Sequence, residues 1–140
     1  MAGLTLRIIT PERVVLDESV EKVSVTATDG SMGILPRHAG MVAALDPGEL
    51  TYQVAGAEES LFVAGGFVEV RGDTVRVLTA AGERWTEIDE ERAREAEQRA
   101  RERLDLSRES AQRDAVDMVR VRASLQRALA RIRLYSRRSR

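Results

Sequence analysis

The chain ends in a stretch of 58 residues without glycine or proline, and this stretch decides the fold. It runs from Glu83 to Arg140 and reads ERWTEIDEERAREAEQRARERLDLSRESAQRDAVDMVRVRASLQRALARIRLYSRRSR. All ten glycines and all three prolines lie in the first 82 residues. Glycine and proline mark turns and strand ends, whereas Ala, Glu, Arg and Leu favour helix. The sequence therefore predicts an all-β N-terminal part followed by a helical C-terminal part.

Two apolar stripes in the C-terminal part predict two helices. The first stripe consists of small residues at spacings of three, four and four: Ala93, Ala96, Ala100 and Leu104. The second follows a heptad pattern: Met118, Val121, Leu125, Ala128, Ile132 and Tyr135. The stripes can face each other in an antiparallel hairpin that turns between residues 105 and 110. Asp89 is expected to cap the first helix, because its side chain can accept from the first backbone N–H groups.

Short stretches of alternating apolar and polar residues recur about every ten residues in the N-terminal part, as is typical of a small antiparallel sandwich. The predicted strands cover residues 4–8, 13–16, 23–27, 41–45, 50–54, 61–64, 67–70 and 75–78. Turn signals lie at 10–12, 28–31, 46–48 and 71–73. We therefore predict an antiparallel β-sandwich over residues 1–86 and an α-helical hairpin over residues 87–140.

The residue types that support catalysis are scarce. Cysteine is absent and His38 is the only histidine, so neither a hydrolytic triad nor a cluster of zinc ligands can be assembled. Neither of the glycine-rich phosphate-binding motifs occurs. No apolar run is long enough to span a bilayer, and residues 1–10 lack the pattern of a signal peptide. We predict a binding protein that is not an enzyme, with no catalytic residue and no metal site.

The net charge of −1 conceals a gradient along the chain. Residues 111–140 carry nine arginines against two acids, whereas residues 1–110 are acidic overall. A basic end suggests an acidic partner: nucleic acid, an acidic protein surface or the chain's own acidic segment. Tyr135 is the only aromatic residue among the terminal arginines, which leaves no stacking platform for bases. Nucleic acid is therefore the less favoured partner.

One loop resembles a known family. Residues 33–39 read GILPRHA, which resembles the G-[IL]-[LY]-P-x-H-A loop of the epsilon subunit of F-type ATP synthases. Further similar fragments follow in the same order: VEKV at 20–23, LDPG at 45–48, GGFVEV at 65–70 and IDEERA at 88–93. Each fragment alone is weak, but their order and spacing cover essentially the whole chain.

The resemblance implies a non-catalytic subunit of the rotor's central stalk. In that family the sandwich binds the gamma subunit through an apolar face and rests its loops on the ring of c subunits. The expected gamma or c-ring interface comprises Asp29, Gly30, Ser31, Met32 and His38. Ser31 stands where some members have an acidic residue. His38 is expected to be a loop histidine bonded to backbone, because an imidazole needs only a modest partner.

The fragment IDEERA also fits the [IL]-D-x-x-R-A signature, which in some bacterial members binds ATP between sandwich and hairpin. The resemblance implies a regulatory ATP site, with no required cofactor, at Glu83, Ile88, Asp89, Arg92, Ala93, Arg99 and Arg122. The last arginine of that set is Gln126 here, and Arg127 lies one position further, so weaker neutralisation of the phosphates is expected. The structural alternative is that Asp89 is only a helix cap and Arg92 pairs with Glu91 or Glu95.

The hairpin of bacterial and chloroplast members lies folded on the sandwich in one state and extends along gamma into the catalytic head in the other, where it blocks ATP hydrolysis. The resemblance implies such an inhibitory arm, which would meet the alpha and beta subunits through Arg120, Arg122, Arg127, Arg131 and Arg133. A permanent structural hairpin is the alternative. Outside this family, the rival is a stand-alone anion or nucleic-acid binding module that uses the arginine-rich C-terminus.

The expected location follows from the same resemblance. The absence of a transit peptide favours the cytoplasmic face of a bacterial plasma membrane, where the protein would be peripheral and held through the complex. The stromal side of a thylakoid is the alternative, since a plastid-encoded subunit also lacks a transit peptide.

Overall fold

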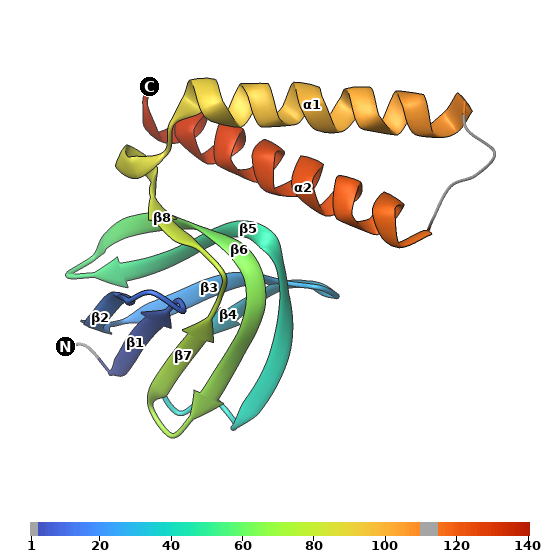
Figure 1. The fold of residues 1–140 in the computed structure, drawn as a ribbon. Helices are drawn as coiled ribbons and strands as arrows, with labels where there is room; N and C mark the ends of the chain where they lie inside the picture. The colour runs from blue at the N-terminus through green and yellow to red at the C-terminus, as the bar shows by residue number, and fades with distance from the viewer. Residues whose placement is uncertain (1–2, 110–114) are drawn as a thin grey trace.

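The structure is a computed structural model that describes residues 3–109 and 115–140. Eight strands form one strongly curved sheet, and two helices form a hairpin that lies across one end of it (Figure 1). The predicted class, a β-sandwich followed by a helical hairpin, is confirmed.

The strands follow the order β2-β1-β7-β6-β5-β3-β4, and β8 pairs with β6. All pairs are antiparallel except β1 and β7, which run parallel. The bounds are β1 Leu4–Ile9, β2 Val14–Val20, β3 Lys22–Ala27, β4 Gly30–Ile34, β5 Met41–Val54, β6 Ala57–Arg71, β7 Thr74–Leu78 and β8 Gly82–Arg84.

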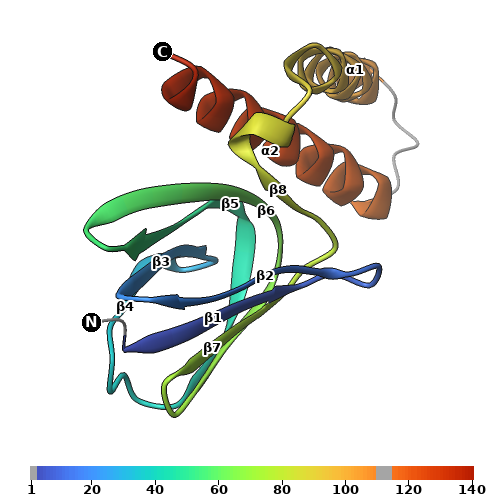
Figure 2. The ribbon, with the colours of Figure 1, turned by 90° about the vertical axis from the view of Figure 1, so that its left-hand side faces the viewer.

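Strands β5 and β6 are each a single long strand where the sequence predicted two shorter ones. The predicted turn at 46–48 is wrong: Pro47 pairs with Ala64, and the strand bends there without ending. On the facing strand, Gly66 has a φ of 104°, and a Cβ at this residue would lie 2.0 Å from the carbonyl oxygen of Leu78. The glycines thus let both strands curve through the sheet and cover two layers of the sandwich (Figure 2).

Sequence reasoning also missed β4. Gly30 pairs with Ala27 and Ser31 with Thr26, so these two residues lie in a strand and not in the predicted turn at 28–31. The two glycines of this short strand hid it, because glycine weakens the strand signal.

Alternate residues of the strands form the core of the sandwich. This pattern is clearest in β1, where Leu4, Leu6 and Ile8 are buried. Burial of each such side chain contributes about 1.5–3 kcal/mol. The largest fully buried side chains of this cluster are Leu6, Ile8, Ile34, Leu50 and Leu61.

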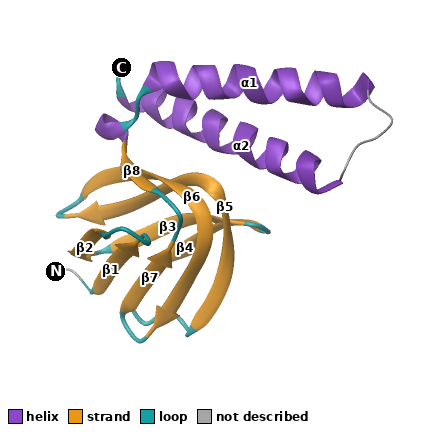
Figure 3. Cartoon of the chain, viewed as in Figure 1, coloured by secondary structure: helices purple, strands orange, loops and turns teal. Residues whose placement is uncertain are grey.

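The helical part comprises a 3₁₀ turn η1 (Trp85–Glu87), α1 (Glu90–Glu109) and α2 (Ala115–Arg138). The hairpin turn predicted over residues 105–110 is wrong for 105–109, which are helical, and residue 110 lies outside the described residues. Of the two predicted stripes, Ala93, Ala100 and Ala128 are buried, whereas Tyr135 at the end of the second stripe packs against Trp85. Helix α2 lies between α1 and the sheet (Figure 3).

Candidate functional site

A small apolar cluster joins the hairpin to the sandwich. Phe62 of β6, Ile88 and Leu134 of α2 form its buried centre, and Ala64, Trp85, Ala130 and Tyr135 pack around them. The rings of Trp85 and Tyr135 meet edge to face with centroids 6.3 Å apart. The heptad pattern did not predict the sandwich-facing residues Ala130 and Leu134. Helix α2 packs against both α1 and the sandwich, and a single heptad stripe describes only one of these two contact faces.

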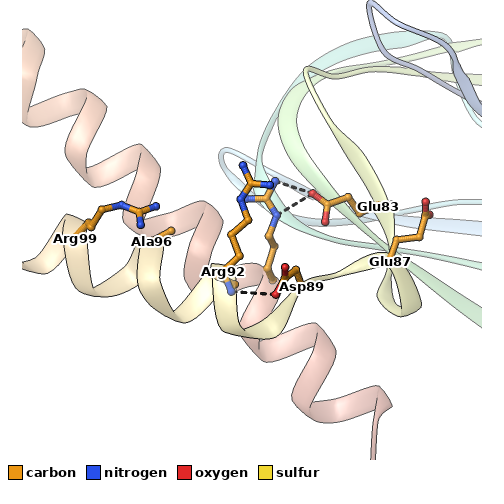
Figure 4. Close-up of a pocket in the computed structure, with 8 residues that line it drawn as sticks. Glu83, Glu87, Asp89, Arg92, Ala96 and Arg99 are labelled. Carbon is orange, nitrogen blue, oxygen red and sulfur yellow. Dashed lines mark hydrogen bonds and ion pairs between the residues drawn. The ribbon is translucent and has the colours of Figure 1, made fainter.

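A cavity of about 510 Å³ lies where β8, η1, α1 and α2 meet (Figure 4). Five of the seven residues predicted for the nucleotide site line it: Glu83, Asp89, Arg92, Ala93 and Arg99. The start of α1 positions Asp89 and Arg92, since Asp89 Oδ1 accepts a hydrogen bond of 3.1 Å from the Arg92 backbone N–H. Asp89 is therefore a helix cap, and its position at the cavity wall is compatible with a second role.

Two predicted residues lie elsewhere. Ile88 is buried in the apolar cluster with Phe62 and Leu134 and is not among the residues that line the cavity. Arg122 is exposed on α2 and is not among the residues that line this cavity. Arg131, which had been assigned to the inhibitory arm only, lines the cavity instead. Sequence spacing could not place Arg131 in the cavity wall, because its position there depends on the register in which α2 packs against α1.

Arg131 links α2 to the sandwich across this cavity. Its Nε and Nη2 atoms donate to Glu83 Oε1 at 3.0 and 2.8 Å, across 48 positions of the sequence. Its guanidinium carbon also lies 4.3 Å from the centroid of the Phe62 ring, which is a cation–π contact. Dashed lines in Figure 4 mark the bonds at Glu83 and Asp89.

The charges in the cavity are mixed. Glu87 accepts from the Arg84 backbone N–H at 3.0 Å, and Glu83 is paired with Arg131. Among the described residues, the guanidinium of Arg92 forms no ion pair, so the expected partners Glu91 and Glu95 do not hold it. Carboxylates can accept from the hydroxyl and amino groups of a ligand, and free guanidinium groups can bind its phosphates. The wall therefore has the chemistry that a nucleotide needs.

The residues predicted for the gamma or c-ring interface are not brought together. Asp29 lies in the turn between β3 and β4, and Gly30, Ser31 and Met32 lie in β4. His38 follows the other end of β4, where its Nδ1 lies 2.8 Å from the carbonyl oxygen of Ala39. The expected backbone partner of His38 is thus found, but this set spans both ends of a strand.

A row of apolar side chains on the outer face of the sheet was missed. The cross-strand pairs place Ala44, Phe67, Leu78, Ile9 and Val14 side by side on five strands. Phe67 and Leu78 are 56% and 50% exposed, and Val42 beside them is 67% exposed. We call the five paired residues the apolar row; Val42 adjoins it from the next row, where it pairs with Glu69. The next row is charged and contains the ion pairs Arg76–Glu69 and Arg7–Asp17.

The alternation in GGFVEV already contained the signal for this exposed apolar surface, because it turns Phe67 to the face opposite the buried Val68.

Other absences are plain in the described residues. Within residues 3–109 and 115–140 no group of three or more His, Cys, Asp or Glu side chains is placed to hold a metal ion. None of the helices described is long and apolar enough to cross a membrane.

A sandwich with an exposed apolar row, a helical hairpin docked on its end and a cavity of mixed charge between them defines a two-part binding subunit. The domain models of the family "ATP synthase, Delta/Epsilon chain" match it on both parts, the beta-sandwich domain at residues 3–85 and the long alpha-helix domain at residues 86–136. The chain belongs to this family and is a non-catalytic subunit, the epsilon chain of ATP synthase.

Similar proteins agree with this assignment. The ATP synthase epsilon chain of Nitratidesulfovibrio vulgaris (strain DP4) is 43% identical over 132 residues, which cover 94% of this chain and 95% of the relative. The epsilon chain of Symbiobacterium thermophilum is 45% identical over 134 residues, covering 95% and 93%. A chain of the Euglena gracilis mitochondrial ATP synthase structure has the same fold, with a TM-score of 0.75 and 24% identity over 93% of this chain and 79% of its own length.

Proposed function

We propose that this protein is a central-stalk subunit of the rotor of an F-type ATP synthase, in which the sandwich binds the gamma subunit and contacts the c ring. The hairpin is a regulatory arm that inhibits ATP hydrolysis. The observation that carries the proposal is the apolar row on the outer face of the sandwich.

The apolar row has the anatomy of a protein interface. It is contiguous across five strands, and ion pairs border it on one side. Exposed apolar patches with a polar rim usually mark interaction sites, since they are costly to leave in water. The hairpin docks through Phe62, Trp85 and Ile88, at a different site, and leaves the row open. The row is therefore the surface that we assign to gamma.

The hairpin is held in a way that permits release. Among the α2 side chains whose burial the structure describes, Leu134, at 1% exposure, is the one that is fully buried against the sandwich. Ala130 and Tyr135 pack around it while only partly buried, and Arg131 lies over the Phe62 ring. Ion pairs of Arg131 with Glu83, Arg137 with Glu49 and Arg138 with Glu59 add to these contacts. Partly exposed pairs contribute about 0–1 kcal/mol each. Contacts with gamma and the catalytic head can take the place of these docking contacts. The hairpin can therefore change between a docked and an extended state.

The cavity between sandwich and hairpin is a regulatory ATP site in this proposal. Glu83 and Asp89 would accept from the base or ribose, and Arg92 and Arg99 would bind phosphate oxygens. Since sandwich, α1 and α2 all contribute to the wall, a bound nucleotide stabilises the docked hairpin over the extended one. No cofactor is required for folding.

The proposed partners follow from the two parts. The sandwich binds gamma and the c ring, and the released arm meets the alpha and beta subunits. The protein is peripheral to the membrane, at the cytoplasmic face of a bacterial plasma membrane or the stromal side of a thylakoid, and is held there through the complex.

The test is a charged substitution in the apolar row. Phe67→Asp should leave the fold intact, because the side chain is exposed, but should abolish co-purification with gamma. The control is Val54→Asp, which alters an exposed apolar residue at the far end of β5, outside the row. Circular dichroism checks both folds. If folded Phe67→Asp protein binds gamma as well as the control does, the row is not the gamma surface and the proposal fails.

A further inference from the structure

The last turn of α2 makes a second attachment to the sandwich, apart from the cavity at the start of α1. Arg137 pairs with Glu49 of β5, and Arg138 pairs with Glu59 of β6. None of these four residues lines that cavity. The attachment can therefore be tested separately from anything that the cavity binds.

Ser60 of β6 is at the centre of this attachment. Its neighbour Leu61 points into the sandwich core, so Ser60 points to the outer face, where it is nevertheless only 4% exposed. Its hydroxyl donates to Glu49 Oε1 at 2.9 Å. Arg137 Nη2 donates to the same Glu49 oxygen and also to the Ser60 hydroxyl oxygen, which lies 3.4 Å from it. Side chains from β5, β6 and α2 therefore form a closed triangle of polar contacts.

Arg138 extends the attachment along β6. Its Nη2 donates to the backbone carbonyl oxygen of Glu58 at 3.3 Å and lies 3.9 Å from Glu59 Oε2. The carbonyl oxygen belongs to the main chain of a paired strand, so its position is fixed by the sheet. Two adjacent arginines in one turn of a helix thus contact both strands of the β5–β6 pair.

A simpler explanation is that both arginines serve only the helix that carries them. Cations in the last turn of a helix interact favourably with its dipole, and Arg137 and Arg138 lie in the last turn of α2. The helix dipole does not account for the buried Ser60 or for the Glu49 oxygen that two donors share. Members of such a connected polar network support one another, so loss of one weakens the contacts of the others.

We propose that Glu49, Ser60 and the Glu58–Glu59 segment form a docking site for the arginine pair of α2, and that this site is an electrostatic latch on the hairpin. The latch holds the docked state whether or not the cavity contains a ligand. Because its ion pairs are partly exposed, salt screens them, and the latch weakens as the ionic strength rises. Its effect on ATP hydrolysis rests on the proposed function of the arm, but its effect on docking does not.

The first test follows cleavage of the full chain by chymotrypsin. Tyr135 is the only aromatic residue of α2, and every variant keeps it. In the docked hairpin Tyr135 packs against Trp85, so the rate of the cut after Tyr135, identified by mass spectrometry, reports the undocked population when opening is fast. Arg137→Ala with Arg138→Ala should raise this rate at least about fivefold, which equals about 1 kcal/mol.

The matched control is Arg94→Ala with Arg101→Ala. It removes the same charge from α1, where both arginines pair with acids of their own helix. The cut after Tyr135 should keep its wild-type rate in the control.

A charge exchange separates the latch from a role in the helix dipole alone. Glu49→Arg and Arg137→Glu each place like charges together, so each alone should raise the cleavage rate about fivefold or more. Combined, they restore opposite charges across the same contact, and the rate should return to within about twofold of the wild-type value. The dipole alone predicts no such rescue, because a glutamate at 137 stays unfavourable at the end of α2. Glu49→Gln removes only the charge and takes the place of Glu49→Arg if the latter does not fold.

Salt provides an independent measurement. Raising the ionic strength from about 0.15 M to about 1 M shortens the Debye length from about 8 Å to about 3 Å. The wild-type cleavage rate, corrected for protease activity at each salt concentration, should rise more than that of Arg137→Ala with Arg138→Ala, whose latch is already lost. The comparison cancels the remaining ion pair between α2 and the sandwich, Arg131 with Glu83, since both proteins keep it.

The latch is wrong if the arginine variant is cleaved at the rate of the control, if the exchanged protein is cleaved as fast as its single variants, or if both proteins respond equally to salt. In a complex reconstituted with alpha, beta and gamma, the variants that open the latch should lower the ATPase rate at low ATP, because a released arm inhibits. Rescue by charge exchange in the isolated chain, together with an unchanged ATPase rate in the complex, would support the docking site and contradict the inhibitory role of the arm.

Discussion

Gly66 shows how a single residue without a side chain fixes the course of the longest strand. Its φ is 104°, and an added Cβ would lie 2.0 Å from the Leu78 carbonyl oxygen, on a neighbouring strand that cannot move away freely. Gly72 has a positive φ of 59° as well, but open space surrounds its Cβ position. The two glycines therefore separate backbone strain from steric overlap.

We predict that Gly66→Ala lowers the free energy of unfolding by about 3 kcal/mol or more, because overlap with backbone adds to the left-handed penalty. Gly72→Ala should cost only about 1–2 kcal/mol, the penalty for the positive φ alone. Urea denaturation of both variants measures the difference. Equal losses would show that the sheet relaxes around Gly66 and that the bend does not depend on it.

Asp89 is the residue at which a structural and a binding role can be separated. Its carboxylate caps α1 through the Arg92 N–H and also lines the cavity. Asparagine is as good an N-cap as aspartate but carries no charge, whereas alanine costs about 0.5–2 kcal/mol as a cap.

We predict that Asp89→Asn keeps the helix content of α1 but weakens ATP binding, while Asp89→Ala loses both. Trp85, the only tryptophan, packs against the cluster beside the cavity and reports the binding through its fluorescence. Circular dichroism measures the helix content. A wild-type titration with no response in fluorescence or calorimetry up to millimolar ATP would leave Asp89 with the helix cap as its only role.

Among the elements, α2 carries the contact that docks the hairpin. Leu134 is its fully buried contact with the sandwich, in a cluster separate from the sandwich core. Truncation of a buried leucine typically costs about 2–5 kcal/mol. Here that cost should fall on docking, because the sandwich core does not include this residue.

We predict that Leu134→Ala releases the hairpin without unfolding the sandwich. Trp85 emission should shift as its neighbour Tyr135 leaves, and α2 should be cleaved faster by protease. Val119→Ala is the control, since Val119 is exposed on the same helix. The urea midpoint of the sandwich should stay where it is in the wild-type protein. Simultaneous loss of both parts in one transition would show that hairpin and sandwich form a single cooperative unit.

Features of helices and strands that depend on neighbouring residues were predictable from the sequence. Features that depend on contacts between residues far apart in the sequence were not. The start of α1 at Asp89 and the stripe from Ala93 to Ala100 depend on neighbouring positions, and both are found. Strand β4 and the continuity of β5 depend on pairing with β3 and β6, which composition does not contain. Likewise, five predicted residues reach the cavity through their order along one segment, whereas Arg131 reaches it only through the packing of α2.

At the scale of the whole molecule, the sandwich has its own core and the hairpin adds to its surface. Within the part of the chain that the structure describes, the cluster of Leu6, Ile8, Leu61 and their neighbours contains no helical residue. We predict that residues 1–86 alone fold and bind gamma through the apolar row. Co-purification of gamma with this fragment measures the binding, and the Phe67→Asp fragment is the control. A folded fragment that does not retain gamma, while the full chain does, would assign the hairpin a part in assembly.

The arginines of the arm do not have equal roles in the two states. Arg131 is engaged in the docked state, where it pairs with Glu83 and covers Phe62. Arg120 and Arg122 are exposed in that state, and neither pairs with a carboxylate among the described residues. Their replacement therefore costs the docked hairpin nothing, while both remain available to an acidic surface in the extended state.

These different roles predict opposite effects on ATP hydrolysis in a complex reconstituted with alpha, beta and gamma. Arg131→Ala should favour release of the arm and so deepen inhibition, because each lost contact of about 1 kcal/mol shifts a two-state balance about fivefold. Arg120→Ala with Arg122→Ala should weaken the inserted state and raise the ATPase rate towards that of a complex lacking residues 87–140, which sets the uninhibited limit. Rates at low ATP measure both, since little nucleotide then stabilises the docked hairpin. If both arginine variants raise the rate alike, Arg131 acts mainly in the inserted arm. If the deletion itself leaves the rate unchanged, the hairpin is a permanent structural element and the inhibitory role is wrong.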